Sequence, residues 1–137
     1  DSVQFAGMIL PEHIGYYYHL GNLFVSASVS ETQGLTYIEA LASGVPALCR
    51  SDACLDGVIL DGRNGWLYKS EDDYLEKLYS FMSSTEMQKN MSERAAKLAR
   101  QMFSSAVFAE KVERVYLDVL YGTAEKKAVT CLGEMSC

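Results

Sequence analysis

The chain has 137 residues, of which 49% are hydrophobic, and a formal net charge of −6. This length suits one domain with a real core, and the negative balance leaves no basic stripe for nucleic acid and no polybasic patch for contact with a membrane. With no apolar run near the ~20 residues of a membrane span and no signal peptide, we expect a cytoplasmic protein.

The first segment predicts a strand, a loop and a helix. Val3–Ala6 is predicted to be a strand and stands almost at the first residue of the chain. An intact domain of this type would have further strand–helix units before this strand. We therefore expect a piece of a longer protein. The loop Gly7–Ile9 follows, and Pro11 opens a helix that reaches about Leu20. The tyrosines and histidines of this helix are interpreted as packing and surface residues, since no metal-ligand partner stands at the right spacing.

A strand–loop–helix–strand unit comes next. The apolar run Asn22–Ala27 leads into a loop of capping residues, a helix of apolar periodicity covers Leu35–Ser43, and Gly44 ends it before the strand Val45–Cys49. Such units build parallel sheets. In these sheets the loops at the carboxyl ends of strands line the ligand crevice, and the next helix aims unpaired N–H groups into it. A phosphate is the ligand this arrangement favours.

Two glutamates flank the start of this helix. Glu39 is the only charged side chain between Leu35 and Ser43. If its face is buried, its carboxylate needs hydrogen-bond donors, which sugar hydroxyls supply. Glu31 lies in the loop before the helix, within reach of whatever the helix end holds. Spacing alone leaves a second interpretation equally open, with Glu39 on a solvated helix face and Glu31 at an exposed loop tip.

A glycine turn and two capped helices follow. Two short extended pieces, Val58–Leu60 and Trp66–Tyr68, flank a turn at Asp61–Gly65, and Trp66 is expected to anchor the core. Ser70 predicts the cap of one helix and Thr85 the cap of the next, each with an apolar stripe.

The last part of the chain divides into a helix and a tail. The helix runs from about Ser105 to Tyr121 with an apolar face, and residues 122–137 lose periodicity, which predicts a disordered tail. We assign residues 1–121 to one α/β domain. The four cysteines form no C-x-x-C pair, so neither a zinc site nor a disulfide framework is expected.

Residues 28–46 carry a resemblance to a known family. Ser-x-Ser-Glu-Thr-x-Gly-Leu, followed by Glu-Ala-Leu-Ala-Ser-Gly-x-Pro, resembles the donor-site signature of family-four retaining glycosyltransferases of the GT-B fold, which has seven residues between two glutamates. The resemblance extends from Val3 to about Tyr121. The residues of the motif are most similar to those of bacterial enzymes that glucosylate diacylglycerol. It implies the nucleotide-sugar-binding, C-terminal domain of a two-domain enzyme, with a Rossmann-like, mostly parallel sheet flanked by helices and a helical C-terminal third.

The resemblance also implies site residues. Glu31 would be the catalytic residue and contact the donor sugar, and Glu39 would bind both ribose hydroxyls. Gly7, Met8 and Ile9 would contact the nucleotide base, although an ordinary tight turn explains them equally well. The backbone N–H groups that would hold the sugar and the diphosphate belong to four consecutive residues: Thr32, Gln33, Gly34 and Leu35.

The activity implied is transfer of a hexose, with retention, from a nucleotide sugar to an acceptor. Similarity suggests UDP-glucose and diacylglycerol, with no bound metal and no cofactor, in an enzyme peripheral on the inner face of the membrane. The phosphate-binding arginine and lysine of the family and its N-terminal acceptor-binding domain lie outside this chain, and Arg50 is not a convincing substitute. We therefore predict that the isolated chain is inactive.

Two other functions and one assembly remain open. The chain could be half of a GT-B epimerase or phosphorylase, an alternative that the residues around Glu31 disfavour. It could also be a non-catalytic interaction module with a vestigial pocket. Without earlier strands, the sheet would expose an unpaired edge, which predicts a homodimer.

Overall fold

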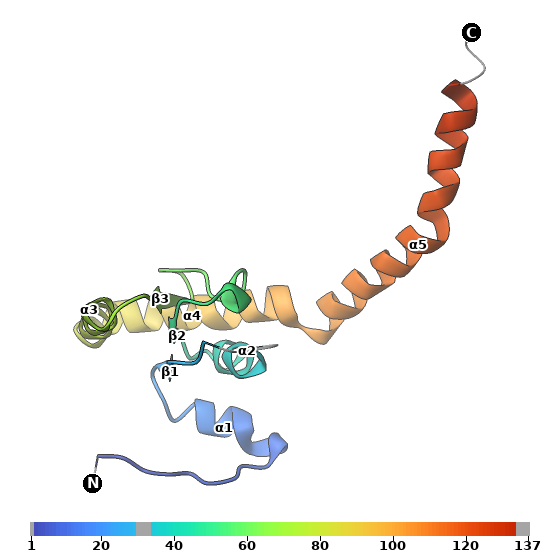
Figure 1. Ribbon diagram of the computed structural model, residues 1–137. Coiled ribbons are helices and arrows are strands. Elements are labelled where there is room, and N and C mark those ends of the chain that lie inside the picture. Colours follow the sequence, from blue (N-terminus) through green and yellow to red (C-terminus); the bar gives the residue numbers. More distant parts are fainter. Residues whose placement is uncertain (1, 30–33, 134–137) are drawn as a thin grey trace. The chain divides into compact units, whose positions relative to one another are not determined.

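The computed structural model describes residues 2–29 and 34–133, the last twelve of these by their backbone alone, and forms two compact units that divide between Gln101 and Met102. Figure 1 shows the elements along the chain. In order they are η1 (Pro11–His13), α1 (Ile14–Tyr18), β1 (Phe24–Ser26), α2 (Leu35–Ala42), β2 (Ala47–Arg50), η2 (Ala53–Leu55), β3 (Gly65–Tyr68), α3 (Glu71–Met82), α4 (Thr85–Phe103) and α5 (Ser105–Gly133).

A parallel sheet of three strands, in the order β1-β2-β3, is the centre of the first unit. The helix α2 connects β1 to β2, as expected for a crossover between parallel strands. The α/β class, the mostly parallel sheet and the helical last third of the chain agree with the sequence-based prediction.

The register of β1 and β2 shows which of their side chains share a face of the sheet. Phe24 and Ser26 pair with Ala47 and Cys49, and all four point to one face because side chains alternate along a strand. The helix α2 covers this face: the rings of Phe24 and Tyr37 meet edge to face at 5.5 Å, and the hydroxyls of Ser26 and Tyr37 hydrogen-bond at 2.9 Å.

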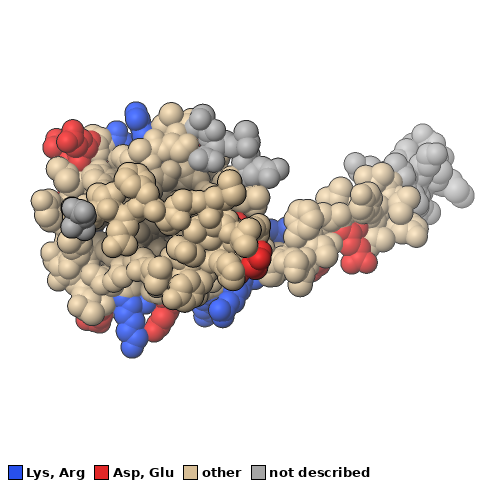
Figure 2. Space-filling view, turned by 90° about the horizontal axis from the view of Figure 1, so that it is seen from below, with Lys and Arg blue, Asp and Glu red and all other residues tan. Residues whose placement is uncertain are grey.

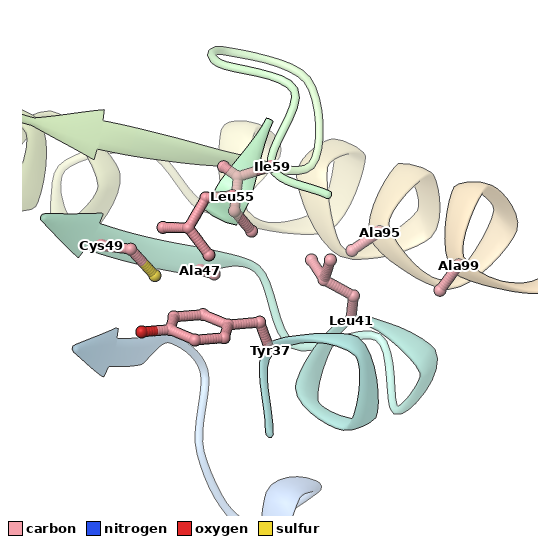
Figure 3. Close-up of a cluster of buried hydrophobic side chains, with 8 residues drawn as sticks. All are labelled: Tyr37, Leu41, Ala47, Cys49, Leu55, Ile59, Ala95 and Ala99. Carbon is pink, nitrogen blue, oxygen red and sulfur yellow. The ribbon is translucent and has the colours of Figure 1, made fainter. Parts of the chain in front are cut away.

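The main cluster of buried side chains lies on this α2-covered face. Figure 3 shows Tyr37 and Leu41 of α2 pointing toward β2, with two alanines of α4 beside them. The eight members of the cluster are Tyr37, Leu41, Ala47, Cys49, Leu55, Ile59, Ala95 and Ala99. Burial of this apolar surface stabilises the fold by roughly 25 cal/mol per Å².

The opposite face of the sheet carries Leu48 and Trp66, which pair with each other across β2 and β3. The Trp66 ring meets buried Phe81 of α3 edge to face, with centroids 5.9 Å apart. Trp66 is therefore an anchor between the sheet and α3, as predicted, although it is only half-buried.

Two predicted extended segments are not strands. Val3–Ala6 forms no strand, and Val3 and Phe5 are 67% and 95% exposed, so this segment has neither a ladder neighbour nor a buried face to hold it. Val58–Leu60 is likewise not a strand. There the buried Asn64 side chain accepts from the Leu60 N–H at 2.7 Å and donates to the Val58 carbonyl at 2.9 Å, so side-chain bonds replace a strand ladder.

The second unit contains the rest of the chain, and its helix is longer than predicted. The helix α5 begins at Ser105 as expected but continues to Gly133 rather than ending near Tyr121. No proline interrupts residues 122–133, and alanine, glutamate and lysine in this stretch favour a helix. The predicted apolar face lies open, with Phe108 and Val119 67% and 68% exposed.

Candidate functional site at the carboxyl edge of the sheet

The helix α2 begins after the carboxyl end of β1, and its first turn has neither a side-chain cap nor an acidic residue. Its N-cap is Gly34, which has φ +59° and no side chain to cap the helix, and no acidic residue stands in the first turn. A Cβ on Gly34 would meet the Tyr37 ring at 3.3 Å, so both backbone conformation and space favour glycine. The partial positive charge of this helix end is therefore not neutralised by acids of its own first turn.

The helix α3 also begins at this edge, after β3, but its first turn is already satisfied. The Ser70 hydroxyl accepts from the Asp73 N–H at 3.2 Å, and Glu71, Asp72 and Asp73 supply three carboxylates. Asp73 also forms an ion pair with Lys77 at 2.7 Å, which with the Lys69 N–H lowers the pKa of this carboxyl. Of these two helix ends, α2 is the one suited to an anion from outside.

Glu39 lies one turn inside α2, on the exposed side of that helix. The buried side consists of Tyr37, Ala40 and Leu41, whereas Leu35 is 57% exposed although it is apolar. The solvated-face interpretation of Glu39 is thus correct for its exposure. The carboxylate nevertheless has a partner, because Oε2 accepts a hydrogen bond from the Tyr18 hydroxyl at 3.3 Å.

Tyr18 is the side chain at this site that sequence reasoning missed. It was assigned to packing, and its ring does pack, meeting Phe24 edge to face with centroids 6.0 Å apart. Partial burial, followed by the charge and hydrogen bond of Glu39, raises the pKa of Tyr18 to about 12. A run of three tyrosines gives no signal that singles out the third, since the contact joins residues 21 positions apart.

The other predicted site residues are placed as follows. Gly34, Leu35 and Glu39 share the first turns of α2. Gly7 has φ +72°, which suits a glycine turn, Met8 is 97% exposed and Ile9 is partly buried; their role at the base stays a prediction. The remaining three lie outside the described residues: Glu31, Thr32 and Gln33.

A hollow of about 450 Å³ lies at the carboxyl ends of the strands. Its lining comes from all three strand ends and the start of α3: Val25, Ala27, Arg50, Tyr68, Lys69, Ser70, Glu71 and Tyr74. Arg50 pairs with Tyr68 and so points to the face opposite α2. Arg50 is exposed, as expected for a solvated arginine.

Possible metal ligands and surface charge were compared among the residues that the structure describes. No group of three His, Cys, Asp or Glu side chains that could hold a metal ion exists within residues 2–29 and 34–133. On the face shown in Figure 2, lysines and arginines are spread along the rim among acidic residues, and the centre is uncharged. None of the helices in the described part of the chain is both long and apolar enough to cross a membrane.

Comparisons with known proteins place this chain among sugar-transferring enzymes. Residues 1–98 match the family model of the group 1 glycosyl transferases. The chain is 38% identical over 120 residues to an alpha-monoglucosyldiacylglycerol synthase of Streptococcus pneumoniae, and 32% identical over 114 residues to the Acholeplasma laidlawii protein of the same name. These alignments cover 88% and 83% of this chain but 26% and 28% of the relatives, so the chain spans about a quarter of their length.

Solved structures share the fold at low sequence identity. Sucrose-phosphate synthase from Thermosynechococcus elongatus superposes with a TM-score of 0.76 at 22% identity, over 88% of this chain and 31% of that one. Anabaena HepE, solved in complex with UDP and glucose, gives a TM-score of 0.73 at 18% identity, over 85% and 32%. The family match over residues 1–98, together with a parallel sheet of the GT-B type, shows that the chain belongs to the group 1 glycosyl transferases.

Proposed function

We propose that this chain is the nucleotide-sugar-binding part of a retaining hexosyltransferase. The observation that carries the proposal is the start of α2, where a glycine N-cap and an acid-free first turn stand next to an exposed carboxylate on the same helix. The helix end suits a diphosphate, and Glu39 suits a pair of vicinal hydroxyls, because a carboxylate offers two acceptor oxygens.

In this proposal each residue of the motif has one role. Glu39 binds the ribose hydroxyls, and Glu31 contacts the donor sugar at the reacting centre. The N–H groups of residues 32–35 hold the sugar and the diphosphate, whose developing charge they stabilise as the bond to the sugar breaks. Gly7–Ile9 contacts the base.

The names of the relatives support a choice of substrates. Two relatives are named as synthases of alpha-monoglucosyldiacylglycerol, and one structural neighbour was solved with UDP and glucose. We infer that the donor is UDP-glucose and the acceptor diacylglycerol.

Turnover requires more than these 137 residues. Because the chain spans about a quarter of the length of its relatives, we propose that the acceptor-binding domain and the basic residues for the phosphates belong to a longer protein. The isolated chain is then expected to bind a nucleoside diphosphate weakly and to transfer no sugar. Turnover by the 137-residue chain in a radiolabelled sugar-transfer assay would overturn this.

The site is tested by Glu39→Gln. This change keeps the shape of the side chain but removes the charge, so it weakens charge-assisted bonds to the ribose. We expect the affinity for UDP, measured by calorimetry, to fall about 10- to 100-fold, which corresponds to ~1.4–2.7 kcal/mol. The matched control is Glu76→Gln, an exposed glutamate of α3, which should leave the affinity unchanged. Equal UDP affinity in the wild type and Glu39→Gln would refute the ribose role.

A further inference from the structure

We propose that Tyr18 is a positioning residue for the ribose-binding carboxylate: its hydroxyl, 3.3 Å from Glu39 Oε2, holds Glu39 in the orientation that accepts the two ribose hydroxyls. This inference rests on the proposed function of the site. It adds a residue from α1, a different element from the one that carries the motif, to the machinery of donor binding.

The Tyr18 hydroxyl is well placed because a chain of rings fixes it. The Tyr18 ring meets Phe24 of β1 with centroids 6.0 Å apart, and Phe24 meets Tyr37 of α2 at 5.5 Å, both edge to face. Tyr37 is 1% exposed and belongs to the main buried cluster. The position of the Tyr18 hydroxyl is thereby tied to the core, whereas Glu39 is an exposed side chain with three rotatable bonds.

The chemistry of the pair suits this role. A phenol hydroxyl donates one hydrogen bond, which occupies one acceptor site on Oε2 and leaves the other site on Oε2 and both sites on Oε1 for the vicinal diol. The pKa of Tyr18, about 12, keeps the phenol protonated and donating throughout the neutral range. A carboxylate oriented in advance loses less conformational freedom when the nucleotide binds.

The test combines a side-chain change with an edited ligand. Tyr18→Phe removes the hydroxyl but keeps the ring against Phe24, so the variant should fold. We measure binding of UDP and of 2′,3′-dideoxy-UDP to the 137-residue chain by calorimetry. We expect Tyr18→Phe to weaken UDP binding about 3- to 10-fold and to leave dideoxy-UDP binding unchanged, because the edited ligand has no hydroxyls for Glu39 to accept from.

Controls separate positioning from a structural role. Tyr17→Phe removes a hydroxyl from a neighbouring position of α1 and should change neither affinity. In Glu39→Gln, adding Tyr18→Phe should cost no further UDP affinity, since the oriented charge is already gone. The Tyr18 pKa, followed by absorbance near the phenolate band, should fall in Glu39→Gln but stay above its ordinary value, because burial, the larger cause of the shift, remains when the negative charge is removed.

Each outcome decides between the proposals. Equal loss of UDP and dideoxy-UDP binding in Tyr18→Phe would show a structural role, and no loss of either would show no role; both overturn the inference while leaving the proposed function intact. If the wild-type chain binds none of UDP, GDP and ADP, the proposed function fails and this inference fails with it.

Discussion

Cys49 lies in the middle strand of the sheet, on the face that α2 covers, and has no exposed surface. Burial raises the pKa of this thiol to about 12, with a smaller raising effect from Cys54 and a lowering one from a hydrogen bond with the Ser26 backbone. The neutral thiol is thus the form that the fold prefers. The stability linked to this group is present below the unfolded thiol pKa of roughly 8.5 and is lost as the pH rises toward about 12.

Alkylation of Cys49 and Cys54 tests whether the Cys49 thiol is buried and neutral. At pH 8 the thiolate fraction of Cys49 is small and its sulfur is enclosed, so we expect iodoacetamide to modify it at least roughly 100-fold more slowly than an ordinary exposed thiol. Half-buried Cys54 is the internal comparison and should react faster. Peptide mapping by mass spectrometry distinguishes the two sites, and equal rates at Cys49 and Cys54 in the folded chain would contradict the burial argument.

At the scale of elements, the starts of α3 and α4 each depend on a hydrogen bond from a backbone N–H to a serine hydroxyl. Ser70 caps α3 as the sequence predicts, through the Asp73 N–H. The cap of α4 is Ser84 rather than the predicted Thr85, because the Ser84 hydroxyl accepts from the Met87 N–H at 3.2 Å and Thr85 is the first helical residue. Ser84 and Thr85 are both residue types that cap helices, so the sequence does not distinguish them. Only the backbone conformation shows which of the two precedes the helix.

Paired alanine variants test which residue caps α4. Ser84→Ala removes an acceptor from the first turn of the helix and should lower the free energy of unfolding by about 0.5–2 kcal/mol. Thr85→Ala changes an exposed helical position to a better helix former and should be neutral or slightly stabilising. Urea titration followed by circular dichroism measures both. The assignment is wrong if Thr85→Ala is the more damaging change.

At the scale of the whole molecule, β1 is an edge strand of the sheet that the structure describes. Among the described residues β1 has β2 as its hydrogen-bonded neighbour, and Val25 in the middle of β1 is 47% exposed. An open strand edge offers N–H and C=O groups to another chain. The homodimer that the sequence suggested therefore stays a prediction, now located at β1.

Light scattering tests this prediction with a charge placed at the edge. We expect the 137-residue chain to self-associate at high concentration, and Val25→Lys to weaken the association about tenfold or more, because a lysine on an edge strand opposes further pairing. Val115→Lys, at a position 61% exposed in the second unit, is the control and should leave the association unchanged. A wild-type chain that is monomeric at all concentrations would rule out the edge as an interface.

The sequence by itself determined the α/β class, the strand–helix–strand order around α2, the beginning of that helix after Gly34 and the family. The first three follow from local periodicity and from glycines at fixed offsets, which act over a few residues, whereas the family follows from the resemblance of residues 28–46 to its donor-site signature. The tertiary structure decided which side of α2 is buried, that Val3–Ala6 forms no strand, and that Tyr18 donates to Glu39. Those outcomes depend on contacts between residues far apart in the chain, and such contacts leave no periodic trace in the sequence.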